Sequence, residues 1–205
     1  MTSAQPRRTQ AERRSESERS LLKAAIDVIA SSGVGAVTFE ALGRESGLSR
    51  GLATQRFGSK QKLIEAVLAD LHERQEAMLA EHGLEARPGL EAILTYLDVA
   101  VSDLALCNEA RAYFMLLSSS VAEASNLREG FRGSHAEFER RFKRWVEKGQ
   151  AEGEIRAAVD PDAAALMIGC LLFGLSMQLL VDPAMDLAPL RQTSLAMLRI
   201  SLAAP

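Results

Sequence analysis

Aromatic residues and cysteines are scarce in this 205-residue chain, and both shortages narrow the possible folds. Aromatic side chains make up 5% of the residues while alanine and leucine are abundant, which favours helices over sheets. Cys107 and Cys170 are the two cysteines, and both lie in apolar helical stretches. We therefore expect buried, reduced thiols rather than a disulfide framework. The first residues form no apolar signal segment, so we expect a cytoplasmic protein.

The sequence also lacks the residue groupings that perform catalysis or hold a metal. His72, His82 and His135 have no metal-ligand spacing with one another or with the cysteines. The segment Gly33–Gly35 follows a helical pattern rather than a strand, which argues against a phosphate-binding loop. No Ser/His/Asp or Cys/His arrangement is apparent. We expect no enzymatic activity, no cofactor and no metal.

Charge is distributed unevenly along the chain. The net charge is −3, which alone would argue against a nucleic-acid-binding protein. However, residues 1–60 contain 10 Lys and Arg against 6 Asp and Glu, whereas the remainder contains 14 against 21. A basic first segment on an acidic remainder would direct DNA to one end of the chain.

Residues 38–60 contain three helix starts and two helix stops. Thr38, Ser49 and Ser59 are N-cap residues, whose hydroxyls accept a free backbone N–H of the first helical turn. Gly47 and Gly58 tolerate the left-handed conformation that commonly follows a helix. The segment therefore predicts two short helices joined by a tight turn, followed by the start of a third helix. This arrangement is a helix-turn-helix.

The second short helix presents a polar, cationic face. The positions expected to form a small core are Phe39, Leu42, Leu48, Leu52 or Ala53, and Phe57. The positions expected to face outward are Arg50, Thr54, Gln55 and Arg56. Arginine suits phosphates and guanine edges, glutamine suits adenine, and threonine suits a phosphate or a thymine methyl group. The pattern predicts an interface with double-stranded DNA.

Roughly residues 10–70 resemble the DNA-binding domain of the TetR family of transcriptional regulators. The segments Gly47–Gly51 and Phe57–Lys60 match the family's turn and the end of its recognition helix. The resemblance implies a ligand-responsive repressor that binds a palindromic operator as a homodimer and is released by a small apolar or amphipathic effector. We expect phosphate contacts from Thr38, Ser49, Gly51 and Lys60, and base contacts from Arg50, Thr54, Gln55 and Arg56.

One position departs from the family pattern. Thr54 stands where the family usually has a tyrosine that contacts a phosphate. The alternative function is a dimeric small-molecule or protein-binding module without DNA binding.

The remaining chain reads as helical. Residues 1–9 are polar and basic, so they predict either a disordered leader or a flexible arm that follows DNA. Residues 10–60 predict the helix-turn-helix domain and residues 61–205 a helical ligand-binding and dimerisation domain. Apart from the two short ones, the expected helices begin near Thr9 or Ser15 and then cover about 60–81, 89–105, 108–123, 127–152, 160–182 and 185–203, with Gly130 or Gly133 as a possible interruption of the 127–152 helix.

The segment Ala163–Val181 is the most apolar stretch and is long enough to span a bilayer. Acidic residues at both ends and Gln178 within it disfavour a membrane span. A helix apolar on all sides must otherwise be buried, so we expect it to pair with the last helix and a second subunit. In the TetR family the last two helices form such an interface. The interface residues expected here are Leu171, Leu172, Leu175 and Leu179 on the first of these helices and Leu187, Leu190, Leu195, Leu198 and Ile200 on the last.

Most of the aromatic residues fall in the middle of the chain. Most of them should form core, but such a set also suits an apolar ligand pocket with few polar groups. TetR-family regulators enclose their effector with these middle helices. The pocket residues expected here are Tyr96, Tyr113, Phe114, Phe142, Trp145 and Met167.

Overall fold

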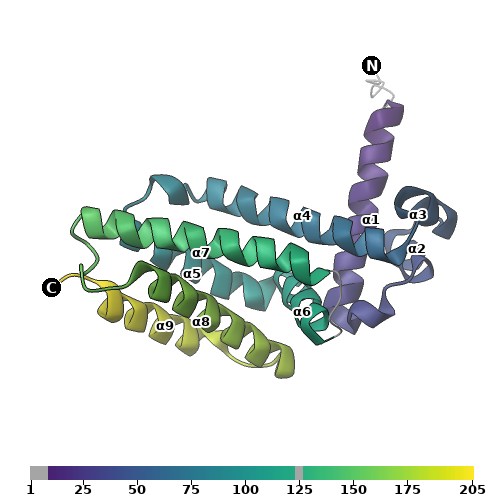
Figure 1. Ribbon diagram of the computed structural model, residues 1–205. Coiled ribbons are helices and arrows are strands. Elements are labelled where there is room, and N and C mark those ends of the chain that lie inside the picture. Colours follow the sequence, from purple (N-terminus) through teal and green to yellow (C-terminus); the bar gives the residue numbers. More distant parts are fainter. Residues whose placement is uncertain (1–8, 123–126) are drawn as a thin grey trace, which may run out of the picture. The chain divides into compact units, whose positions relative to one another are not determined.

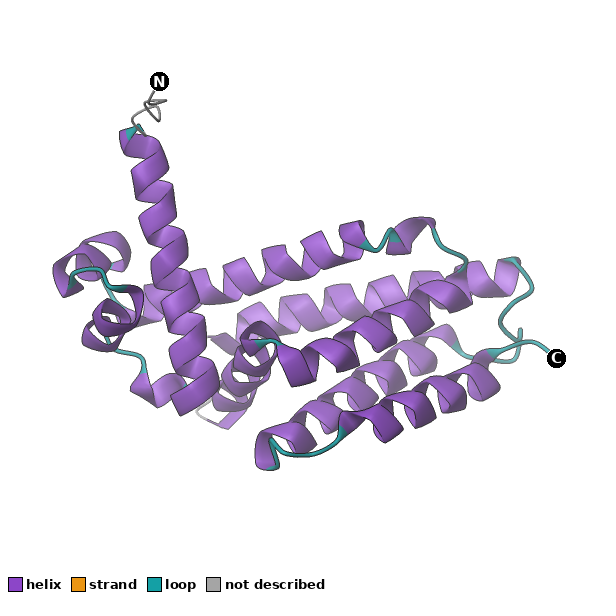
Figure 2. Cartoon of the chain, turned by 180° about the vertical axis from the view of Figure 1, so that it is seen from behind, coloured by secondary structure: helices purple, strands orange, loops and turns teal. Residues whose placement is uncertain are grey.

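The computed structural model describes residues 9–122 and 127–205, and these residues are helical almost throughout (Figures 1 and 2). The α-helices are α1 (Gln10–Ser32), α2 (Phe39–Ser46), α3 (Arg50–Phe57), α4 (Lys60–Glu81), α5 (Gly89–Leu106), α6 (Asn108–Ala122), α7 (Leu127–Ala151), α8 (Pro161–Val181) and α9 (Leu187–Leu202). Two short 3₁₀ helices are η1 (Val34–Ala36) and η2 (Leu84–Ala86). The expected all-α fold is confirmed. The arm expected over residues 1–9 falls, apart from Thr9, on residues 1–8, which lie outside the described part of the chain.

Helix α1 begins with a reciprocal pair of hydrogen bonds. The Glu12 backbone N–H donates to Thr9 Oγ1 at 3.2 Å, and the Thr9 N–H donates to Glu12 Oε2 at 2.7 Å. This capping box satisfies two backbone donors that would otherwise have no partner in the helix. Thr9, rather than Ser15, is therefore the start of the helix. The inner face of α1 buries Leu21, Ile26 and Ile29.

The helix-turn-helix forms as its caps predict. Thr38 Oγ1 accepts from the Ala41 N–H at 3.0 Å, and Ser49 Oγ accepts from the Leu52 N–H at 3.1 Å. Gly47 adopts the left-handed conformation between α2 and α3, with φ of 70°. A Cβ atom at Gly43 would lie 2.9 Å from the backbone oxygen of Leu48. Glycine at position 43 therefore allows the turn to approach α2 closely.

The described chain divides into two compact units within α4. Residues up to Leu71 belong to the N-terminal unit and residues from His72 belong to the C-terminal unit, here called the body. The division lies beyond residue 60, the expected limit of the DNA-binding domain. The first turns of α4, including the buried Leu63 and Val67, cluster with the N-terminal unit. Helix α4 thus contributes residues to both units.

The body packs α5, α7, α8 and α9 together with the last turns of α4. Its core joins Leu97 and Ile93 of α5 to Phe142 and Trp145 of α7 and to Ile168 of α8. The C-terminal segment is attached by a single β-bridge between Ile155 and Ala203. Its backbone bonds run from the Arg156 N–H to the Leu202 oxygen at 2.9 Å and from the Ala204 N–H to the Glu154 oxygen at 2.8 Å.

Helix α5 starts without a side-chain cap of its own because Pro88 occupies the N-cap position. Two carboxylates from the segment after α7 supply the missing acceptors. The Gly89 N–H donates to Glu152 Oε2 at 2.9 Å, and the Leu90 N–H donates to Glu154 Oε2 at 3.2 Å. Negative charge at a helix N-terminus is also favoured by the helix dipole. These bonds connect α5 to a segment more than 60 residues away along the chain.

Two expectations about single residues were wrong. Helix α7 runs from Leu127 to Ala151 without interruption at Gly130 or Gly133, because an isolated glycine weakens a packed helix without breaking it. Neither cysteine is fully buried: Cys107 is half-buried at the end of α5, and Cys170 is exposed on α8. The apolar surroundings of Cys170 in sequence do not place it inside, because α8 is apolar on its exposed side as well.

Replacement of Gly89 by alanine should destabilise the body strongly. A Cβ atom there would lie 2.2 Å from the Trp145 oxygen and 2.3 Å from the Gly149 nitrogen. These are backbone atoms, so the contact cannot be relieved by a side-chain rotation, and the cost should be about 3 kcal/mol, the upper part of the overpacking range. Urea unfolding followed by the fluorescence of Trp145, the single tryptophan, measures it.

The matched control is Gly133→Ala in α7, where nothing lies within 4 Å of the added Cβ atom. That variant should be neutral or more stable by up to ~1 kcal/mol, because alanine is the better helix former. Equal unfolding midpoints for Gly89→Ala and Gly133→Ala would contradict the close contact described for α5 and α7.

Candidate functional site

The outer side of α3 carries four exposed positions. Arg50, Gly51, Thr54 and Gln55 are all exposed. The Thr54 hydroxyl donates to the Arg50 backbone oxygen at 3.0 Å, so its methyl group and its oxygen lone pairs remain available at the surface. Ala53 and Phe57 are buried on the opposite side of the helix. The structure therefore separates a small apolar core from a polar face, as the sequence predicts.

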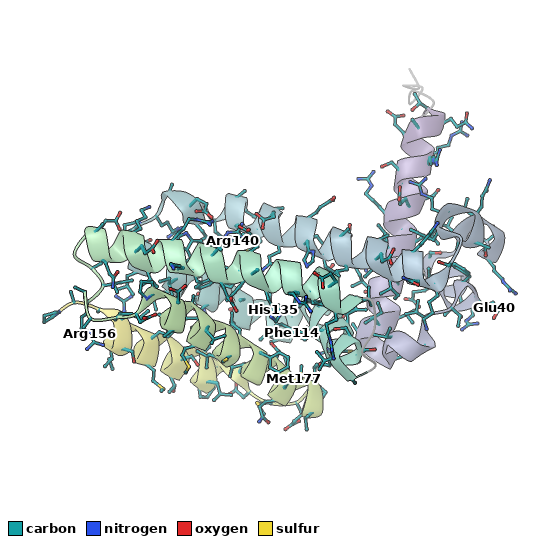
Figure 3. The ribbon with its side chains drawn as sticks, in the orientation of Figure 1. Glu40, Phe114, His135, Arg140, Arg156 and Met177 are labelled. Atoms are coloured by element: carbon teal, nitrogen blue, oxygen red, sulfur yellow. The ribbon has the colours of Figure 1, made fainter. Side chains whose placement is uncertain are left out.

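Arg50 is held in place by an acid from the preceding helix. Its Nη1 lies 2.6 Å from Glu40 Oε1, and both side chains are exposed, at 68% and 59% respectively. Glu40 is in the first turn of α2 and Arg50 is the first residue of α3. Figure 3 shows Glu40 at the surface of the N-terminal unit. The sequence analysis assigned Arg50 to DNA but did not identify this pairing.

Arg56 differs from the expectation that it faces outward. Its guanidinium pairs with the carboxylate of Glu18 on α1, and the two side chains are only 23% and 33% exposed. The two residues are 38 positions apart, so no local pattern indicates the contact. In this structure Arg56 connects α3 to α1 and does not belong to the exposed face.

Two further expected contacts stand at helix starts. Thr38 and Lys60 are exposed, as is Ser49. Helix N-termini carry partial positive charge and free N–H groups, which suits phosphate. Lys60 Nζ lies 3.3 Å from the Gly35 backbone oxygen, a bond that leaves its other two protons available. Thr38, Ser49 and Lys60 thus lie at starts of three successive helices.

In the body, three of the expected pocket residues lie inside the core. Tyr96, Phe142 and Trp145 are buried and contact one another edge to face or tilted, with ring centroids 5.0 to 6.2 Å apart. The Tyr96 hydroxyl accepts a hydrogen bond of 2.7 Å from Gln75 Nε2 on α4. Burial raises the pKa of Tyr96 to about 12, so the hydroxyl stays neutral. We call these three rings the aromatic core.

Tyr113 and Phe114 belong to a second group of rings. Tyr113 contacts Phe114 and Phe131, and the edge of His72, at 5.3 to 6.0 Å. Burial raises the pKa of Tyr113 and lowers the pKa of His72, so both rings favour their neutral forms. Figure 3 shows Phe114 close to Met177 of α8, which accepts a hydrogen bond from Ser118 at 3.4 Å. His72, Tyr113 and Phe114 are half-buried, whereas Phe131 is buried.

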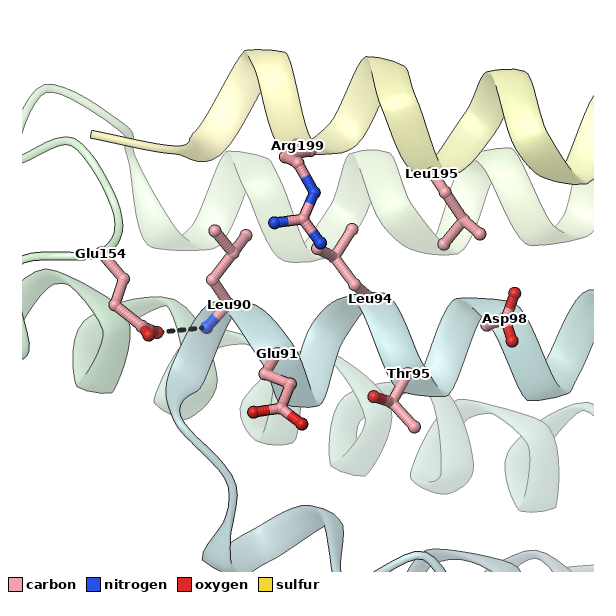
Figure 4. A pocket seen from close by; sticks show the side chains of 8 residues that line it. All are labelled: Leu90, Glu91, Leu94, Thr95, Asp98, Glu154, Leu195 and Arg199. Atoms are coloured by element: carbon pink, nitrogen blue, oxygen red, sulfur yellow. Dashed lines mark hydrogen bonds between the residues drawn. The ribbon is translucent and has the colours of Figure 1, made fainter. Parts of the chain in front are cut away.

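Met167, the sixth expected pocket residue, was assigned to the wrong side of α8. It is 65% exposed and therefore lines no interior pocket. Within the described residues, an open groove of about 450 Å³ lies between α5 and α9 instead (Figure 4). Its lining residues are Leu90, Glu91, Leu94, Thr95, Asp98, Glu154, Leu195 and Arg199. No local sequence pattern indicates this groove, because residues of α5 and α9 that meet there, such as Asp98 and Arg191, are 93 positions apart.

Polar contacts close one side of this groove. Asp98 forms a two-point ion pair with Arg191 of α9, with both distances at 2.7 Å. Figure 4 shows the Arg199 side chain directed from α9 toward Leu94 and the Glu154 carboxylate bonded to the Leu90 nitrogen. The acids in the groove therefore already have partners, and no group of three or more metal-binding side chains occurs in the described part of the chain.

Most of the residues expected at a dimer interface face inward, whereas Leu190 and Ile200 are exposed. Leu172, Leu175 and Leu179 are buried in the body's own core, and Leu171, Leu195 and Leu198 pack against that core. The correction follows from helix register: a helix that is apolar on every side gives no periodicity from which to choose its outer face. The exposed apolar side chains of α8 and α9 are Leu166, Met167, Phe173, Val181, Leu190, Met197 and Ile200, here called the outer apolar face.

Helix α8 is the one helix of the described chain that is long and apolar enough to cross a membrane, and 39% of its most apolar window is buried. In both Figures 1 and 2, α8 and α9 run side by side. One such helix is weak evidence for a membrane span, because a core helix passes the same test. The acids at both its ends, Asp160, Asp162 and Asp182, favour a helix packed against protein.

Similar folds occur in several solved structures. A TetR transcriptional regulator from Chloroflexus aurantiacus J-10-FL is 22% identical, with a TM-score of 0.80 over 94% of this chain and 99% of that chain. A transcriptional regulator from Saccharomonospora viridis, solved in complex with choline, is 19% identical, with a TM-score of 0.76 over 93% and 100%. The ketosteroid transcriptional regulator KstR2 of Mycobacterium tuberculosis is 17% identical, with a TM-score of 0.70 over 96% and 98%. At these identities the likeness shows the fold alone.

Comparison with curated proteins gives no match. Two family models match the sequence and divide it between them. Residues 21–67 match the model of bacterial regulatory proteins of the tetR family. Residues 86–203 match the C-terminal model of BetI-type transcriptional repressors. The second match alone spans more than half of the chain, and the first contains the whole helix-turn-helix. The chain therefore belongs to the TetR family of transcriptional regulators, and its C-terminal domain is of the BetI type.

Proposed function

We propose that the protein is a cytoplasmic repressor without enzymatic activity, which binds a palindromic operator as a homodimer and is released by a small apolar or amphipathic effector. The observation that carries the proposal is the exposed polar face of α3, held by Thr38 and Ser49 caps that fix both short helices. A short helix with its polar side free and its apolar side buried suits insertion into the major groove. The BetI-type C-terminal match supports repression rather than activation.

The proposed division of labour on DNA follows exposure. Arg50, Thr54 and Gln55 read base edges, because they are exposed on α3 and have side chains that fit guanine, thymine and adenine. Phosphates are bound by the helix starts at Thr38, Ser49 and Lys60, and by the backbone of Gly51. We no longer assign a base contact to Arg56, because Glu18 already holds its guanidinium.

Homodimerisation places two recognition helices on one DNA. A single short helix reads few bases, whereas two helices related by a two-fold axis read both halves of a palindrome. The outer apolar face is the proposed contact, because its large side chains stand exposed on adjacent helices. Association through this face would remove its apolar surface from water, which is the main driving force of most protein–protein association. The outer apolar face is thus the proposed dimer contact, in place of the leucines of α8 and α9 that pack against the body's own core.

The effector acts through the aromatic core. Solved relatives include a choline complex and a ketosteroid regulator, so we propose a small molecule with an apolar or cationic surface that aromatic rings can contact. Gln75 and Glu76 of α4 bond to this core region, Gln75 to Tyr96 and Glu76 to Arg141. A ligand that displaces Tyr96 would therefore act directly on α4, the helix that continues into the N-terminal unit.

The DNA assignment is tested by selecting bound genomic fragments with the purified protein and then comparing two variants. Arg50→Ala should relax preference at one base pair in each half-site, by about 1–3 kcal/mol of discrimination. Lys60→Ala should weaken all DNA about equally and lower the salt dependence of binding, because it removes one phosphate contact. Fluorescence anisotropy with operator and scrambled duplexes measures both effects.

The same experiment separates the two candidate functions. Wild-type protein that binds no duplex even at low salt, where phosphate attraction is strongest, would favour the dimeric binding module without DNA binding. Thr54 in place of the family's tyrosine is the observation behind that alternative. Variants that both bind the operator like the wild type would instead show that another face contacts DNA.

The dimer interface is tested by Phe173→Glu and Met197→Glu, which place charges on the outer apolar face. Each should convert the dimer to monomers at micromolar concentration, because an unpaired charge is costly to bury. Sedimentation equilibrium measures the mass. Leu106→Glu is the matched control: Leu106 is 82% exposed but lies at the end of α5. If it alone disrupted the dimer, the proposed interface would be wrong.

The effector prediction concerns reciprocal coupling. With choline as the first probe, effector binding should change the fluorescence of Trp145 and weaken operator binding by about 5–150-fold. Operator DNA should lower effector affinity by the same factor. Tyr96→Phe, which removes the acceptor of the Gln75 bond, should reduce the coupling while leaving operator affinity of the free protein unchanged. Choline that binds the body without affecting operator affinity would contradict this route.

A further inference from the structure

We propose that Glu40 is a positioning residue that determines how Arg50 reads its base; this inference rests on the proposed DNA-binding function. The observation is the 2.6 Å contact between Glu40 Oε1 and Arg50 Nη1. The two residues lie in the first turns of successive helices, and the close approach of the turn to α2 at Gly43 brings these helices together. Neither side chain is held by burial, so the ion pair itself sets the direction of the guanidinium.

The geometry of the guanidinium leaves room for a second partner. Arginine carries five N–H donors in a planar fork, and the contact with Glu40 involves Nη1. The side chain remains 68% exposed, so the rest of the fork is open to a ligand. A guanine presents two acceptors, O6 and N7, that such a fork contacts together. An arginine already fixed on one side loses less conformational freedom when it makes those two bonds.

Stability does not explain an acid at this position. An ion pair between exposed side chains contributes little to folding. A carboxylate on the surface that faces DNA also repels phosphates, so it weakens binding to every sequence. Glu40 therefore lowers overall attraction, and we infer that it provides discrimination between bases in exchange. Acid at the first turn of α2 is favoured by the helix dipole, but an acid elsewhere in that turn would serve the dipole equally well.

The test compares Glu40→Ala with Glu45→Ala, an exposed acid of the same helix with no described bond to Arg50. Both variants lose one negative charge, so both should bind scrambled duplex more tightly than the wild type at equal salt. Only Glu40→Ala should lower the ratio of operator to scrambled affinity, by about 5-fold or more, since a bidentate base contact discriminates by roughly 5–150-fold. Glu40→Gln keeps an acceptor and the side-chain shape, and it should restore most of the ratio.

The operator position at which Glu40→Ala loses its base preference is a second, independent test of the proposal. Selection of operators by Glu40→Ala should relax the same base pair that Arg50→Ala relaxes, and Glu40→Ala should have no further effect in an Arg50→Ala background. An unchanged affinity ratio, an equal loss in Glu45→Ala, or relaxation at another base pair would each overturn the proposal. Wild-type protein that fails to distinguish any sequence would instead refute the DNA-binding function itself.

Discussion

The DNA-facing part of the structure depends on how the helices between residues 38 and 59 begin and end. The hydroxyls of Thr38 and Ser49 each accept a hydrogen bond from a backbone N–H in the first turn of the helix that follows. Gly47 adopts the left-handed conformation that the turn between the two helices requires. With both ends fixed, α3 has only eight residues and no freedom to choose another register. Burial of Ala53 and Phe57 then sets which side is left for a partner. The caps and the buried residues, rather than the helix propensity of the sequence, therefore determine which side chains of α3 form its polar face.

Local rules predicted the helix limits well, because caps and glycines act within four residues along the chain. Contacts between distant residues could not be predicted in the same way. Glu18 and Arg56 are 38 positions apart, and each also reads as an ordinary exposed charge. Because no periodic signal joins them, the sequence analysis placed Arg56 on DNA, whereas the fold places it against α1. The groove between α5 and α9 could not be predicted either, because its two helices are far apart along the chain.

Helix α8 shows a different limit of sequence reasoning. Its two sides are almost equally apolar, so the sequence says that the helix is buried without saying which side faces its own subunit. The fold resolves this: Leu172 and Leu175 enter the core, whereas Phe173 and Val181 remain outside. The same composition explains the resemblance of α8 to a membrane span. A helix that packs against its own core on one side and against the proposed second subunit on the other needs apolar residues all round.

In the proposed mechanism, α4 is the helix through which a ligand bound in the body affects DNA binding. A ligand shifts an equilibrium only by the difference in its affinity for two states, so some contact must differ between them. In the part of α4 that belongs to the body, Gln75 and Glu76 form directional bonds with Tyr96 and Arg141, and Arg141 Nε also lies 3.2 Å from Glu85. Hydrogen bonds weaken steeply when the distance or angle between donor and acceptor changes, whereas apolar contacts tolerate small displacements. A small movement of Tyr96 would therefore change which position of α4 is most stable, and the continuous helix would transmit that change into the N-terminal unit.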